Sequence, residues 1–148
     1  TIRAARTAFN DNCIRFMNHA KINLKDQFWK LLFDYRNSVH ESNLSIEDFC
    51  VSSSAILHIF GLRKAKDLDY IHQGAPLSIN KNNLISSHET ELSYYPSHKD
   101  DILYNDFNHF YFNDIKFCTL DVVKKLKQKR NEPKDIEDIK LIDSLVSD

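Results

Sequence analysis

The stretch VSSSAILHIFGLRKAKDLDYI, residues 51–71, constrains the fold more than any other part of the sequence. Its first residues are apolar and suit the end of a strand, and the serines that follow can cap a short apolar helix ending near Gly61. Alternating apolar and acidic residues then predict a second strand over residues 67–72, with Asp67 and Asp69 on one face. We therefore expect two strands of one sheet, bridged by the helix between them.

The rest of the pattern predicts an α+β protein, a mixed β-sheet with flanking helices that include two at the N-terminus. A long polar segment over 73–105 precedes a hairpin whose turn is Asn113-Asp114. Thr119 can cap the helix after the hairpin, and Pro133 suits the first turn of the last helix. The predicted helices cover 2–17, 24–39, 54–62, 119–130 and 133–146, and the predicted extended segments cover 46–52, 67–72, 91–95 and the hairpin 109–120.

A length of 148 residues suits one compact unit, with an N-terminal helical segment over 1–45 and the main domain over 46–148. The chain starts at Thr1, so we expect a piece of a larger protein with neighbouring domains. The net charge of −1 argues against a nucleic-acid or membrane binder that uses its whole surface. No apolar run reaches the length of a membrane span, and we expect a cytoplasmic protein. Three cysteines without CxxC spacing predict small buried thiols in a reducing compartment.

The residues around the paired aspartates supply what phosphate chemistry needs. Ser53 and Ser54 lie where the short helix begins, and backbone N–H groups there favour phosphate. Asp67 and Asp69 can hold Mg²⁺, which prefers oxygen ligands and substrate phosphates. Arg63 and two lysines between these elements can neutralise phosphate charge. Together these features favour a Mg²⁺-dependent nucleotidyl or phosphoryl transfer.

The same residues resemble the core motif of the nucleotidyltransferase fold shared with DNA polymerase beta, in the form seen in small bacterial members. In that family a Gly-Ser pair begins a helix and an acid-x-acid strand follows, and Ser53-Ser54 and Asp67-Leu68-Asp69 match these two positions. The resemblance continues in LDVVKKLKQKRNEPKDIEDIKLI, which is similar to a family helix pair in which a lysine and an arginine precede a Lys-Asp-x-x-Asp turn. It covers residues 46–146, and the matching residues of the helix pair are Lys127, Arg130, Lys134, Asp135 and Asp138.

The resemblance implies a nucleoside triphosphate as substrate and an acceptor that is a sugar, a small molecule, a protein or an RNA. Family members act beside glycan-assembly enzymes of polysaccharide biosynthesis and in toxin–antitoxin pairs. A third metal-binding carboxylate is expected, for which Asp101 is the candidate taken forward, with Asp106 as an alternative and His109 on a strand where an acid is expected. The implied catalytic metal ligands are Asp67 and Asp69, and the implied phosphate or nucleotide contacts are Ser53, Ser54, Arg63 and Lys127.

Two other interpretations stay open from the sequence. The first is a non-catalytic module of the same fold that binds a ligand or docks a partner, which Ser53 in place of glycine favours. The second is a structural domain in which the paired aspartates only form salt bridges, with Arg63 and Lys66 as partners.

Overall fold

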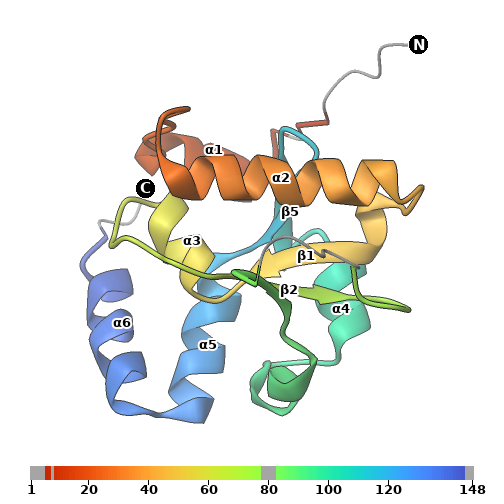
Figure 1. Ribbon diagram of the computed structural model, residues 1–148. Coiled ribbons are helices and arrows are strands. Elements are labelled where there is room, and N and C mark those ends of the chain that lie inside the picture. Colours follow the sequence, from red (N-terminus) through yellow and green to blue (C-terminus); the bar gives the residue numbers. More distant parts are fainter. Residues whose placement is uncertain (1–5, 8, 78–82, 146–148) are drawn as a thin grey trace.

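The computed structural model describes residues 6–7, 9–77 and 83–145 (Figure 1). In this part of the chain five strands form one mixed sheet, in the order β3-β2-β1-β5-β4. The central strand β1 pairs antiparallel with β2 and parallel with β5, while β3 lies parallel to β2 and β4 antiparallel to β5. The chain is therefore α+β, as predicted. The strands are β1 (Phe49–Ser52), β2 (Leu68–His72), β3 (Ile85–Ser87), β4 (His109–Phe112) and β5 (Ile115–Cys118).

Helices flank both faces of this sheet, with α1 and α2 on one side and α4 and α5 on the other (Figure 1). The short helix α3 connects β1 to β2, so the predicted bridge between two adjacent strands is confirmed. The last helix, α6, packs along α5. The helices are α1 (Asp11–His19), α2 (Gln27–Glu41), α3 (Ser54–Ile59), α4 (Lys99–Tyr104), α5 (Leu120–Arg130) and α6 (Pro133–Asp143), with two 3-10 helices, η1 (Ile46–Asp48) and η2 (Glu89–Tyr94).

One hydrophobic core joins the N-terminal helices to the sheet. Phe16 of α1 stacks on Phe110 of β4, with ring centroids 5.1 Å apart. Tyr35 of α2 meets Tyr70 of β2 at 5.6 Å, and Trp29 is buried in the same core. The described residues of the predicted 1–45 segment thus pack into the same core as the sheet, which they cover on one face.

Local chemistry explains several elements that the sequence predicted. Asn113 and Asp114 both have positive φ, 52° and 62°, as the two central residues of a type I′ hairpin turn require. The Thr119 side chain accepts a hydrogen bond from the Val122 N–H and caps α5. Pro133 occupies the first turn of α6, where its missing N–H is no loss.

Other predicted boundaries are wrong. The first helix begins at Asp11, where the Asn10 side chain caps it, so residues 6, 7, 9 and 10 are not helical, contrary to the prediction, while residues 2–5 and 8 lie outside the described residues. Residues 46–48 form η1 instead of the start of a strand, and 91–95 belong mainly to η2 rather than to an extended segment. The long polar segment 73–105 contains β3 and α4, which were not predicted. The predicted continuation of the last helix to Val146 lies outside the described residues.

Candidate functional site

A cleft of about 480 Å³ opens where α3 begins and β2 starts. It brings together five residues that the sequence analysis selected, Ser53, Ser54, Arg63, Asp67 and Asp69. Lys64 and Lys66 of the same α3–β2 connection also line it, and segments distant in sequence complete its wall with Ser86, Ser87, His88, Thr90, Glu91, Arg130 and Lys134.

The two aspartates lie at the start of β2. Asp69 is within the strand, half-buried, and paired in register with Ser52 of β1 and Ser86 of β3. Ser86 Oγ donates a hydrogen bond to Asp69 Oδ1 at 3.0 Å. Asp67 comes just before the strand and is exposed. Both residues line the cleft.

Ser53 holds a backbone conformation that usually requires glycine. Its φ is 62° and its ψ is −135°, and the residue is buried. A side chain in this region costs on the order of 1–3 kcal/mol, a strain that tends to occur at functional sites. The backbone thus follows the path that glycine favours, at the position where the resembled motif has glycine. Because α3 has only six residues, the macrodipole expected to attract phosphate here is small, and side-chain cations carry more of that role.

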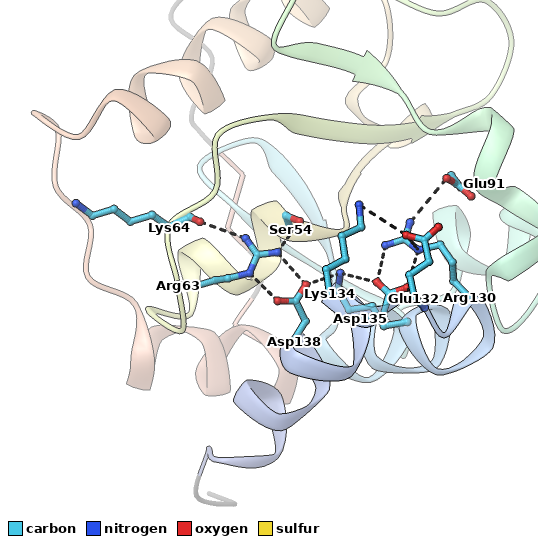
Figure 2. Close-up of polar contacts among 10 residues, drawn as sticks. Ser54, Arg63, Lys64, Glu91, Arg130, Glu132, Lys134, Asp135 and Asp138 are labelled. Atoms are coloured by element: carbon cyan, nitrogen blue, oxygen red, sulfur yellow. Dashed lines mark hydrogen bonds and ion pairs between the residues drawn. The ribbon is translucent and has the colours of Figure 1, made fainter.

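Arg63 reaches from the end of α3 to α6 and back to Ser54 (Figure 2). Its guanidinium donates two hydrogen bonds to Asp138, at 2.7 and 2.8 Å, and one to Ser54 Oγ at 2.9 Å. The hydrogen bond to Asp138 raises the pKa of Arg63. A further N–H donates to the Lys64 carbonyl at 3.2 Å, so four of its five donors are used and Arg63 braces Ser54.

Lys127 does not line the cleft, contrary to the expectation that it contacts a triphosphate. Its side chain is 1% exposed, and its Nζ lies 2.9 Å from Asp138 Oδ2 and 3.6 Å from Asp135 Oδ1. Burial favours the neutral form of Asp138, but hydrogen bonds from Arg63 and Lys127 outweigh it and lower the pKa of the carboxyl. Lys127 therefore joins α5 to α6 beneath the site.

Arg130, rather than the predicted Lys127, contributes a cation of this helix to the lining of the cleft. It donates two hydrogen bonds to Asp135, at 2.9 and 2.7 Å, and its Nη1 lies 3.8 Å from Glu91 of η2 (Figure 2). Burial opposes ionisation of Asp135, yet Arg130, the Glu132 N–H and the charge of Lys127 hold its pKa at about 2. The spacing of Arg130 and Asp135 in the sequence was a signal for this pair, but burial of the pair was not predictable from it.

Asp101 does not join Asp67 and Asp69, so the predicted three-acid metal site is not assembled. Asp101 lies in α4, where its carboxylate accepts hydrogen bonds from Asn105 at 3.1 Å and Asn108 at 3.0 Å. His109 is on β4, at the sheet edge opposite β3. Across the described residues, no group of three His, Cys, Asp or Glu side chains could hold a metal ion.

Two carboxylates still suit Mg²⁺, because this ion commonly takes one or two protein carboxylates and completes its octahedron with water and substrate phosphates. Asp67 and Asp69 are the residues that would hold it.

Comparisons with known proteins found no match to this chain among family models, curated proteins or solved structures. Among the helices that the structure describes, none combines the length and apolar character needed to cross a membrane.

Proposed function

We propose that the cleft binds a nucleoside triphosphate with Mg²⁺ and transfers its nucleotidyl or a related phosphoryl group to an acceptor hydroxyl, on a nucleotidyltransferase-like fold. The observation that carries this proposal is the meeting of the acid pair, the glycine-like turn at Ser53 and a set of cations in one cleft. Bound Mg²⁺ would neutralise charge on the phosphates and polarise the phosphorus–oxygen bonds. Asp67 and Asp69 would hold the Mg²⁺ at the start of β2.

The charge of the cleft supports an anionic ligand. Its lining contains five cations, from Arg63, Lys64, Lys66, Arg130 and Lys134, and three carboxylates, from Asp67, Asp69 and Glu91. Arg63 and Arg130 are already paired with Asp138 and Asp135 behind the wall of the cleft, so Lys64, Lys66 and Lys134 supply the charge most available to an anionic ligand. A polyphosphate is such a ligand, and an arginine such as Arg130 can contact it through two parallel N–H groups.

A non-catalytic module is the second candidate, and one observation favours it. Ser86, not a carboxylate, lies in register with Asp69 on the neighbouring strand, and Asp101 is held elsewhere. With two acids, the cleft would hold a nucleotide or a phosphorylated glycan without efficient transfer. On either account the acceptor or partner is a sugar, a small molecule, a protein or an RNA.

The binding experiment compares the melting temperature of the wild type and of Asp69→Asn with Mg²⁺ and each of ATP, GTP, CTP and UTP. We expect a Mg²⁺-dependent rise for the wild type with at least one nucleotide. Asp69→Asn should lose that rise while folding as well as the wild type, because one charge of the repelling acid pair is removed. Asp106→Asn is the matched control, since its side chain is 88% exposed and outside the cleft.

The outcomes separate the three interpretations. A wild type that no nucleotide stabilises, together with a less stable Asp69→Asn variant, would favour aspartates that serve only in salt bridges. Binding without turnover of labelled nucleotide would favour the non-catalytic module. Binding with turnover supports the transferase.

A further inference from the structure

A chain of hydrogen bonds runs from the cleft into the protein core through His88. His88 Nδ1 lies 2.7 Å from Tyr95 Oη, and Tyr95 Oη donates to Ser52 Oγ at 2.6 Å. All three residues are buried. Tyr95 and Ser52 each carry one hydroxyl proton; with the Tyr95 proton on Ser52 Oγ, a neutral His88 ring donates from Nδ1 to Tyr95, and Nε2 then holds the lone pair.

The sheet places His88 on the same face as Asp69. Ser52, Asp69 and Ser86 form one row across β1, β2 and β3, and side chains in such a row point to one face. His88 comes two residues after Ser86, and its N–H still donates to the Tyr70 carbonyl at 2.7 Å, so the alternation reaches His88. The residue lines the cleft, and within the described chain no hydrogen bond or ion pair reaches Nε2.

The surroundings keep the ring neutral near pH 7. Burial lowers the pKa of His88, and the charges of Arg130 and Lys127 on α5 lower it further, against the opposing carboxylates of Asp69 on β2 and Glu91 on η2. An unprotonated nitrogen in a cationic cleft is a hydrogen-bond acceptor for a hydroxyl group. It offers nothing to a phosphate oxygen, which needs a donor.

We propose that His88 is a catalytic residue of the reaction proposed above, in its nucleotidyl form, and that its Nε2 takes the proton of the acceptor hydroxyl. The acceptor oxygen bonds to the α-phosphorus, the bond from that phosphorus to the oxygen bridging to the β-phosphate breaks, and pyrophosphate leaves. The hydroxyl proton moves to Nε2. Glu91, the third carboxylate of the cleft, lies 3.8 Å from Arg130 Nη1, so His88 is the neutral proton acceptor in the lining, and Tyr95 is a positioning residue that fixes its tautomer.

The first test is ¹⁵N–¹H NMR of the histidine rings, with the His88 signals identified by their loss in His88→Gln. We expect the Nδ1–H tautomer and a pKa below the usual 6.5 for the wild type. Tyr95→Phe removes the hydroxyl that accepts from Nδ1 and should give a mixture of tautomers. An Nε2–H tautomer in the wild type would overturn the proposal without any measurement of activity.

The second test measures how fast pyrophosphate is released from ATP, GTP, CTP or UTP in the presence of Mg²⁺, with water as the acceptor. Nucleotide affinity is measured separately, by calorimetry with an α,β-methylene analogue. His88→Gln should lower release by about 10²–10⁴-fold, the usual contribution of a general base, and leave affinity unchanged. The wild-type rate should fall as the pH drops through the pKa of His88, and the rate of the variant should not show this fall. His98→Gln is the matched control, because its side chain is 75% exposed and lies outside the cleft.

Each outcome bears on one proposal or on both. Equal release by wild type and His88→Gln overturns the role of His88 and leaves the transferase standing. Nucleotide binding without release by the wild type also overturns that role and leaves the non-catalytic module. Absence of nucleotide binding overturns both proposals.

Discussion

The substitution Asp135→Asn tests the buried charges that support the cleft. Asp135 is fully buried and accepts two hydrogen bonds from Arg130 and one from the Glu132 N–H, with Lys127 Nζ 3.6 Å away. Asparagine keeps the shape and one acceptor oxygen but removes the charge. Removing one member of a buried ion pair costs about 3–5 kcal/mol, because the partner charges stay buried. We expect a loss of unfolding free energy in this range.

The pH dependence gives a second, independent magnitude. The pKa of Asp135 is about 2 in the folded protein against an ordinary 3.8, and each unit of difference corresponds to about 1.4 kcal/mol. The charge of Asp135 thus stabilises the fold by about 2 kcal/mol at neutral pH. Because the folded pKa is the lower one, this stabilisation is complete above the unfolded pKa and is lost as the pH falls through about 2. The difference between wild type and variant should shrink by about 1 kcal/mol from pH 6 to pH 3.

Urea unfolding followed by the fluorescence of Trp29 measures both effects. Trp29 is the only tryptophan in the sequence, is 1% exposed and lies in α2, outside the charged cluster. The control is Glu137→Gln on the same helix, whose 71% exposed side chain pairs with Lys140 and whose loss should cost less than about 1 kcal/mol. A loss below about 1 kcal/mol for Asp135→Asn, or a difference that does not change with pH, would refute this account of the buried pair.

Three further experiments test the fold. Ser53→Gly should raise the unfolding free energy by about 1 kcal/mol because its φ is positive, and Ser53→Ala should give no such gain; thermal melting distinguishes them. Phe60→Ala should cost about 3–5 kcal/mol in urea unfolding because its ring is buried against Phe16, whereas the half-exposed Ile136→Ala should stay within about 0.5 kcal/mol. The three cysteines are all buried, so a thiol reagent should modify them only under unfolding conditions, and fast labelling of the native protein would contradict the packing.

The elements that the sequence predicted well are those with local causes. The hairpin depends on two turn residues that tolerate positive φ, and α5 depends on the Thr119 cap. The bridge from β1 through α3 to β2 depends on short apolar runs separated by serines and by Gly61, whose φ is 74°. Such signals are complete within a few residues.

The elements that the sequence did not predict depend on distant partners. The strand β3 has three residues, and pairing with β2 is what makes them a strand. In α6, the apolar Ile136 is 45% exposed while the acidic Asp135 and Asp138 are buried, the reverse of what residue polarity alone predicts. Cations from α5 and the side chain of Arg63 pair with Asp135 and Asp138 and make their burial favourable. No periodicity within α6 predicts these partners.

The buried ion pairs that Asp135 and Asp138 form also change which arginine we expect to contact a phosphate. Buried ion pairs are often replaceable by apolar residues without loss of stability, so stability alone does not explain why Lys127 and two aspartates are buried here. An apolar interior, however, cannot hold a guanidinium in a fixed orientation at the wall of a cleft. Arg63 has four of its five donors engaged, whereas Arg130 commits only two to hydrogen bonds with Asp135 and turns Nη1 toward Glu91. Arg130 therefore keeps more N–H groups without a hydrogen bond, but its side chain is only 6% exposed, so an anion reaches them only by displacing Glu91. Arg63 is better suited to holding Ser54 in place beside it.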